Sequence, residues 1–223
     1  FGLYFDYNAK LAKLLKQAID ACMAADNEFA IKWFDYQNEL YQQGCPITKT
    51  SNDKAIKVQP LDGLEHLNID GNKYEAFNTS GGVASMCETY ADKVKTMSYK
   101  TIRYPGHHSN MKFLLEDLNL KHNKLKFIDL FDQEVPYTTK DVVVMFITVI
   151  GMIDGKLQER TFQKKIYGDK TLNAIQRTTA SGVCAVVQAY TEGKLEGSGF
   201  QKQEDVPFEV FTSNKFGKLY EQE

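Results

Sequence analysis

The chain has little excess charge of either sign and no long apolar run. Its 223 residues contain 27 lysines and arginines against 29 aspartates and glutamates, which gives a formal net charge of -2. Without a basic excess there is no general attraction to nucleic acid or to an anionic membrane surface. The longest apolar run, residues 142–153, ends at an Asp-Gly pair and falls short of the ~20 residues that span a bilayer. We therefore expect no nucleic-acid partner and no membrane association.

Cysteine is scarce and never closely spaced. No Cys-x-x-Cys pair occurs, so no disulfide framework is expected from the four cysteines, Cys22, Cys45, Cys87 and Cys184. The last two lie inside apolar helical patterns and are expected to be buried, reduced thiols. Residues 1–7 also lack the basic start and the small-residue cleavage site of a secretory signal. Together these features predict a cytoplasmic protein.

The common nucleotide and hydrolase fingerprints are missing as well. No GxGxxG follows a predicted strand, and GxxxxGK[ST], GxSxG and HExxH do not occur. The nearest glycine pairs, Gly81-Gly82 and the Gly197-Gly199 spacing, match neither phosphate-binding pattern. The residues alone therefore predict a pocket for a small anionic or zwitterionic ligand, without a complete catalytic set.

Hydrophobic periodicity predicts one compact α+β domain over residues 1–223, built on an antiparallel or mixed sheet with packed helices. Helices are expected at residues 8–24, 28–42, 83–90, 109–118, 125–131, 183–190 and 206–211. Strands are expected at residues 55–58, 68–77, 96–103, 141–153, 156–167 and 172–178. Loops or turns are expected at 48–54 and 61–67, and the Asp70-Gly71 and Asp154-Gly155 pairs predict hairpin turns. The apolar run in 142–153 predicts burial on both faces of that strand.

The residues that can carry chemistry gather between positions 74 and 108. A strand-like run leads into Asn78-Thr79-Ser80-Gly81-Gly82 and then into a helical pattern. A hydroxyl such as that of Ser80 is there either a helix cap or, with the glycines and the free N–H groups, part of a site for a carboxylate or phosphate. A similar hydroxyl turn is predicted at residues 178–181, and the two turns could face one pocket.

A second predicted strand ends at Arg103 and runs into Tyr104-Pro105-Gly106-His107-His108. An arginine at this place either clamps a ligand carboxylate through two parallel hydrogen bonds or forms a structural salt bridge. Adjacent histidines project differently and no further ligand cluster is visible, so no metal site is predicted. Ser109 is expected to cap the next helix.

Within this stretch the segments YEAFNTSGG, CETYADKV and YKTIRYPGH resemble the C-terminal, substrate-binding domain of the saccharopine dehydrogenase family, which includes lysine 6-dehydrogenase-type enzymes. The resemblance continues through MKFLLEDL, DVVVMFITVIG, AIQRTTASGVCAVV and GFQKQEDV to FGKLY. It covers roughly residues 29–220, whereas residues 1–27, with their expected helix, are not matched.

The resemblance implies an α+β substrate-binding and dimerisation domain, forming a homodimer, from an amino-acid oxidoreductase. In that family a separate Rossmann domain binds NAD or NADP, and hydride passes between the nicotinamide and an amino-acid carbon. This chain lacks the Rossmann fingerprint, so we expect no cofactor bound to it and no turnover by the chain alone. The amino-acid substrate stays open among lysine, saccharopine and a carboxynorspermidine-type compound.

By the same resemblance, Thr79, Ser80 and Arg103 are expected to bind substrate, and Tyr104 or His107 to transfer the proton. Histidine suits that role because it titrates near neutral pH, and deamination needs a base near the amine. Two alternatives remain open: a non-catalytic amino-acid-binding or regulatory module, and a purely structural dimerisation unit.

Overall fold

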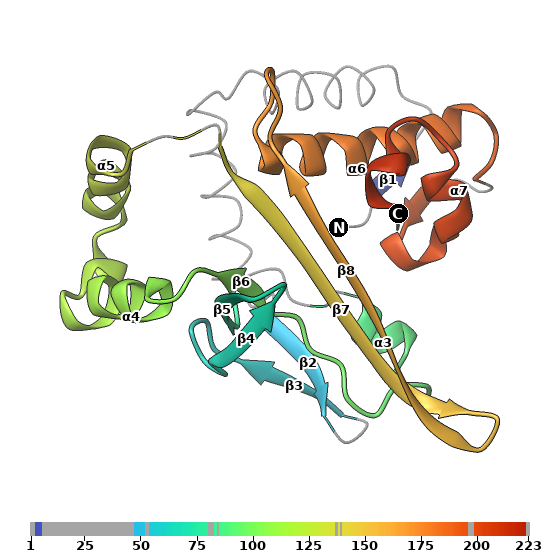
Figure 1. Cartoon of the computed structure of the whole chain (residues 1–223), viewed down its shortest axis with the longest axis horizontal. Coiled ribbons are helices and arrows are strands. Elements are labelled where there is room, and N and C mark those ends of the chain that lie inside the picture. Colours follow the sequence, from blue (N-terminus) through green and yellow to red (C-terminus); the bar gives the residue numbers. More distant parts are fainter. Residues whose placement is uncertain are drawn as a thin grey trace. The chain divides into compact units, whose positions relative to one another are not determined.

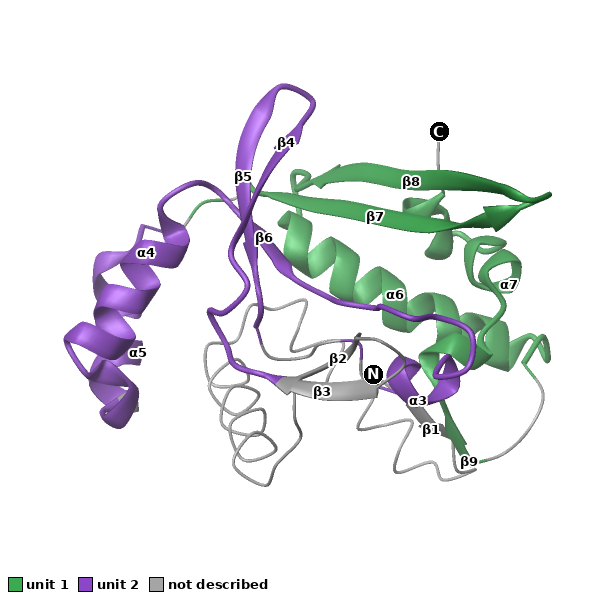
Figure 2. Cartoon of the chain, turned by 90° about the horizontal axis from the view of Figure 1, so that it is seen from below, with its two compact units in different colours: residues 1–31, 138–223 green, residues 32–137 purple. Residues whose placement is uncertain are grey.

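The computed structural model describes residues 3–5, 47–51, 54–79, 83, 85–136, 138, 140–195 and 199–221. The fold is α+β, with small antiparallel sheets and several helices (Figure 1), which confirms the predicted class. The chain forms two compact units, residues 32–137 and residues 1–31 with 138–223 (Figure 2). The helices predicted at 8–24 and 28–42 lie outside the described residues. Among the described helices, none combines the length and apolar character needed to cross a bilayer.

The unit of residues 32–137 is built on a three-stranded antiparallel sheet with β5 in the centre. Its strands, in spatial order, are β4 (Glu65–Ile69), β5 (Asn72–Phe77) and β6 (Thr101–Arg103). The Asp70-Gly71 turn is confirmed: both residues have positive φ, 51° and 76°, as a two-residue hairpin of type I′ requires. The turn predicted at 61–67 was wrong beyond residue 64, because pairing with β5 extends β4 back to Glu65.

A second hairpin in this unit joins β2 (Ile47–Ser51) to β3 (Lys54–Val58), so the loop predicted from residue 48 was wrong for 48–51. The helical elements are α3 (Met86–Thr89), α4 (His107–Lys112), a π-helical turn (Phe113–Asp117), a 3-10 turn (Leu120–His122) and α5 (Lys124–Glu134). Ile69 and Phe77 are the largest fully buried side chains, and Cys87 is buried as predicted. The core of this unit therefore lies on the sheet.

The other unit is dominated by a long hairpin of β7 (Val142–Ile153) and β8 (Lys156–Tyr167). Its Asp154-Gly155 turn again has two positive φ angles, 51° and 71°, and is confirmed. The predicted burial of β7 on both faces was wrong, since Val149 and Ile150 are each 62% exposed. A two-stranded ribbon has too few neighbours to cover two apolar faces.

Helix α6 (Ala174–Thr191) packs against this hairpin and crosses it at an angle (Figure 1). The strand predicted at 172–178 and the hydroxyl turn at 178–181 were wrong, because α6 includes most of both segments. Asn173 forms a capping box with Gln176, and the Asp141 carboxylate accepts the N–H of Ala174 at 2.7 Å. These caps start the helix early, and the Thr178 hydroxyl simply donates to the Ala174 carbonyl oxygen at 3.0 Å.

The chain's two ends meet in this unit. A short strand β1 (Leu3–Phe5) pairs antiparallel with β9 (Gly199–Gln201). A 3-10 turn (Gln203–Asp205), α7 (Phe208–Thr212) and a last 3-10 turn (Gly217–Tyr220) follow. α7 confirms the helix expected at 206–211, shifted by one or two residues. The buried Asn214 side chain ties this end to α6 by donating to the Ala185 carbonyl oxygen at 3.0 Å.

Replacing Gly217 by alanine is expected to destabilise this unit by about 3 kcal/mol. A Cβ at this position would lie 1.7 Å from the Phe211 carbonyl oxygen, and backbone must move to relieve that overlap. Thermal denaturation of the full chain measures the loss. Gly151→Ala is the matched control, because nothing lies within 4 Å of its added Cβ. Equal melting temperatures for the two variants would contradict the close approach at Gly217.

Candidate functional site

A buried carboxylate holds the turn that follows β6. Glu75, on the central strand β5, is only 4% exposed. One of its oxygens accepts the backbone N–H of Gly106 at 3.0 Å, and the other accepts the N–H of His108. Gly106 is the N-cap of α4, has φ 95° and carries no side chain that could cap the helix. Glu75 therefore supplies from the sheet the cap that the local sequence lacks.

The two histidines at the start of α4 have different surroundings. Both rings contact Phe77, with centroid distances of 6.1 Å for His107 and 5.1 Å for His108. His108 Nε2 also lies 2.6 Å from the Leu61 carbonyl oxygen, to which it donates. His108 is thus committed to the fold, whereas no hydrogen bond from the ring of His107 to a described residue competes with a ligand.

Helix α4 begins at His107, two residues before the predicted cap at Ser109, which was wrong. The remote carboxylate of Glu75 stabilises the earlier start, and the Ser109 hydroxyl instead donates to the Gly106 carbonyl oxygen at 3.0 Å. Within the described part of the chain, no three His, Cys, Asp or Glu side chains lie close enough together to hold a metal ion.

Arg103 ends β6 with most of its donors unused. It stands directly opposite Glu75 in the strand register, yet its Nη1 donates to the carbonyl oxygen of its own neighbour Ile102 at 3.0 Å. The ion pairs among the described residues do not include it. A guanidinium has five donors in a planar fork. The exposed side chain can therefore receive a carboxylate through two parallel hydrogen bonds.

The environment of His107 favours its neutral form. Partial burial lowers the pKa of His107 below its ordinary value, and the Arg103 charge lowers it further, while the Glu75 carboxylate opposes both. At neutral pH the imidazole is then largely uncharged and can accept a proton. The Arg103 charge therefore acts on the His107 imidazole, and their roles as ligand clamp and base stay predictions.

Tyr104 connects this turn to the other face of the sheet. Its ring stacks on that of Tyr74 with centroids 5.5 Å apart and an interplanar angle of 26°. The side chain is nevertheless 63% exposed, so the phenol is reachable from solvent. Tyr104 can act on a ligand held at the turn, although its position alone assigns it no proton-transfer role.

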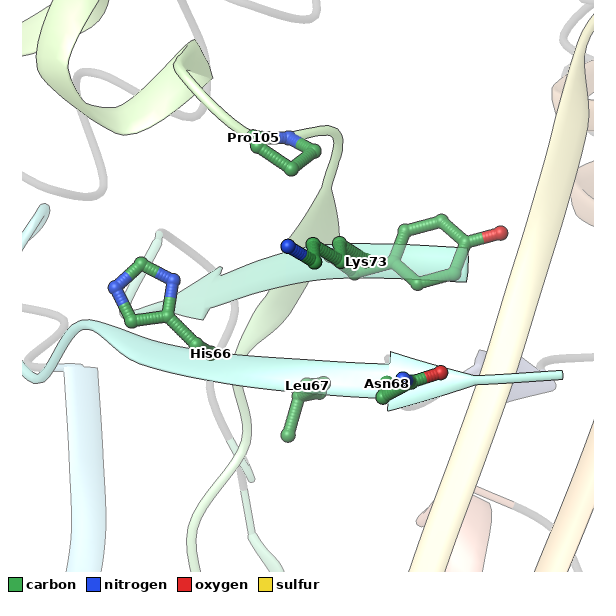
Figure 3. Close-up of a pocket in the computed structure, with 6 residues that line it drawn as sticks. His66, Leu67, Asn68, Lys73 and Pro105 are labelled. Carbon is green, nitrogen blue, oxygen red and sulfur yellow. The ribbon is translucent and has the colours of Figure 1, made fainter. Parts of the chain in front are cut away.

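An open hollow of about 390 Å³ lies beside the turn. Two strands and the turn contribute to its lining, which is His66, Leu67, Asn68, Lys73, Tyr74 and Pro105 (Figure 3). Glu75 is paired in the strand register with His66 on β4 and with Arg103 on β6. Directly opposed residues share a face, so a row of three titratable groups crosses the sheet next to the hollow. Of the basic side chains, His66 and Lys73 line the hollow, whereas Arg103 stands in the row beside it.

Thr79 lies beyond the end of β5, away from the row that contains Arg103. It is half-buried and follows the end of β5, four positions beyond Glu75. At about 3.3 Å a residue it lies up to ~13 Å along the strand direction from the row that contains Arg103. Ser80 and the two glycines after it lie outside the described residues. Thr79 therefore stands further along the strand direction than Arg103, whereas His107, whose ring stacks on Phe77, lies on the side of Glu75 toward Thr79.

Sequence reasoning missed Glu75, His66 and Lys73. One signal was available for Glu75: a carboxylate stands inside the run Tyr74–Phe77, whose other members are apolar or aromatic. An ionisable residue in such a run requires hydrogen-bond partners if it is buried. The partners themselves could not be predicted, since they lie 31 and 33 residues further along the chain.

No model of a known protein family matches this chain. The likeness of YEAFNTSGG and YKTIRYPGH to the saccharopine dehydrogenase family therefore stays a prediction, and the site rests on its own geometry.

Proposed function

We propose that this chain is the substrate-binding and dimerisation part of an NAD- or NADP-dependent oxidoreductase of the saccharopine dehydrogenase type, acting on an amino acid. The observation that carries the proposal is Arg103, an exposed guanidinium without a carboxylate partner among the described residues, next to a histidine with a lowered pKa. In the proposed reaction Arg103 holds the substrate carboxylate. His107, with Tyr104 as the second candidate, takes the proton from the amine as hydride leaves the neighbouring carbon.

The dinucleotide supplies the hydride acceptor in the whole enzyme and belongs to a domain with a Rossmann fingerprint. This chain contributes what its own residues can do: it orients a carboxylate, presents a neutral base and offers an anion-binding hollow. A chain with this division of labour is inactive by itself. Cytoplasmic location, expected from the cysteine pattern, fits such an enzyme.

Isothermal titration calorimetry of the chain with L-lysine, L-glutamate and saccharopine tests the pocket directly. We expect a measurable heat with at least one of the three and none with butylamine, which has an amine but no carboxylate. Arg103→Ala is expected to abolish the heat, because the carboxylate loses its charged partner. Absence of heat with all three amino acids at millimolar concentration contradicts the proposal and favours a purely structural unit.

A second candidate is a non-catalytic amino-acid-binding or regulatory module, which needs the same pocket but no hydride acceptor. The coding sequence upstream of residue 1 separates the two. A strand followed by GxGxxG supports the enzyme, whereas a reading frame that starts near residue 1 supports the module.

The dimerisation part of the proposal is supported by β7. The strand has no charged residue over its whole length, and in the described sheet it pairs only with β8. Exposed apolar side chains occur on both of its faces: Ile147 is 53% and Ile150 62% exposed. By contrast, β8 carries Lys156, Glu159, Arg160, Lys164 and Lys165.

Long apolar edges of this kind pair with another strand. We propose that the partner is β7 of a second copy, in an antiparallel pair about a two-fold axis. Identical copies give an interface in which the same patch meets itself. In such a pair, no charge on β7 opposes a charge on its copy in any register.

A further inference from the structure

Capping the N-terminus of α4 with Glu75 requires a carboxylate to be buried away from water. An ionised carboxylate withdrawn from water costs several kcal/mol unless hydrogen bonds and charges compensate it. A Ser, Thr, Asp or Asn at the N-cap performs the same capping locally and stays in contact with solvent. Here the N-cap is Gly106, and the cap comes from a side chain that is 4% exposed, 31 residues earlier in the chain.

The place of the charge suggests what it adds. Glu75 lies between Arg103 and His66 in the strand register, and two positions before Phe77, on which the ring of His107 stacks. Glu75 and Phe77 point to the same face of the sheet because side chains alternate along a strand. The negative charge and the imidazole therefore occupy one face, and Arg103 stands on that face as well.

We propose that Glu75 is the positioning residue of this site: its carboxylate fixes the Tyr104–His108 turn on the central strand and balances the Arg103 charge at His107. The assignment rests on the proposed function in one respect, namely that His107 is the group that takes the proton. A neutral cap would hold the same turn but would leave the imidazole exposed to the field of Arg103 alone.

The charged groups around His107 are expected to shift its pKa in opposite directions. On the same face, Glu75 contributes a negative charge and Arg103 a positive one, with His66 on β4 and His108 on α4 as the neighbouring imidazoles. Removing a negative charge lowers the pKa of a histidine, and removing a positive charge raises it. The pKa of His107 is already lowered by burial and by Arg103 and raised by Glu75, in agreement with these signs.

The experiment is an NMR titration of the histidine rings in the full chain, which has only four histidines to assign. Glu75→Gln, which keeps the size and one carbonyl acceptor, is expected to shift the His107 titration midpoint to lower pH. Arg103→Gln is expected to shift it to higher pH. Glu65→Gln is the matched control, because this exposed carboxylate sits on the same sheet but on the opposite face; it is expected to leave the midpoint unchanged.

An unchanged or raised midpoint in Glu75→Gln overturns the proposal, because it would show that the negative charge of Glu75 does not stabilise the protonated His107 ring. If Glu75→Gln does not fold, the proposal is tested by amide NMR measurements on Glu75→Asp and on the wild-type chain. The aspartate keeps the charge but retracts it by one methylene, so the Gly106 and His108 amide signals are expected to move. In the wild type these two amides are expected to exchange with solvent more slowly than that of Ser109, and equal exchange overturns the assignment.

None of these measurements uses substrate. Suppose the midpoint falls in Glu75→Gln and rises in Arg103→Gln, as expected, but the chain binds no amino acid. The Glu75 assignment then stands and the proposed function does not. A chain that binds an amino acid but shows no shift in Glu75→Gln loses the assignment alone.

Discussion

If the proposed function is right, Arg103→Ala, placed in an enzyme that joins this chain to a cofactor domain, is expected to raise KM for the amino acid by about 10- to 150-fold. Charge-assisted hydrogen bonds contribute roughly 1.5–3 kcal/mol, and each 1.4 kcal/mol is a factor of ten. In the proposed reaction Arg103 holds the substrate carboxylate both before and during the chemical step, so the loss falls mainly on KM. Binding of NADP(H), or of NAD(H), is expected to stay intact. Steady-state kinetics over a range of amino-acid concentrations measures both parameters.

The same substitution carries a pH signature. Removing the Arg103 charge removes one cause that lowers the pKa of His107. The pKa then rises, the neutral imidazole is populated only at higher pH, and the acid limb of kcat/KM moves to higher pH. Arg103→Lys keeps the charge but loses the planar fork. It is expected to raise KM less than alanine does and to leave the acid limb in place.

Arg160→Ala is the control for general effects of losing an arginine, because Arg160 lies on the exposed strand β8. It is expected to leave KM and the pH profile unchanged. An unchanged KM in Arg103→Ala removes Arg103 from the substrate site.

The double substitution Val149→Lys and Ile150→Lys is expected to dissociate the proposed dimer. The two side chains point to opposite faces of β7 and are each 62% exposed within one copy. Burying a large aliphatic side chain contributes about 1.5–3 kcal/mol. Each substitution occurs in both copies, so the dissociation constant is expected to rise at least ~1000-fold. Sedimentation velocity separates the dimer from the 25.4 kDa chain.

Gln158→Lys adds a charge on β8, which is charged already, and serves as the matched control that stays dimeric. Two results speak against the β7 interface. One is a wild-type chain that is monomeric at ~100 μM, and the other is a double-lysine variant that remains dimeric. The second result leaves a dimer in place but moves its interface elsewhere.

Local structure could be predicted from the sequence wherever neighbouring residues determine the backbone conformation. The Asp70-Gly71 and Asp154-Gly155 turns are examples, because Asp and Gly tolerate the positive φ angles that a two-residue hairpin needs. Helix α5 and the hairpin strands followed from periodicity in the same way. The candidate site could be found as a stretch, since hydroxyls, an arginine and histidines cluster at predicted element ends.

The sequence-based predictions were wrong where residues far apart in the chain determine the start of a helix or the burial of a strand. Helix α6 starts at Ala174 partly because Asp141, 33 residues earlier, accepts its N–H. The apolar composition of β7 predicted burial, but burial depends on which elements lie over a strand, and composition does not specify them.

The residues between positions 74 and 108 thus determined by themselves which chemical groups this protein presents and on which kinds of element ends they stand. Only the tertiary structure decided that Glu75 would cap the turn, that His108 would be tied to Leu61 and that Arg103 would donate to Ile102 and not to a carboxylate. The physical reason is that hydrogen bonds over 31 to 47 residues leave no periodic trace in the sequence, whereas turns and helix faces do.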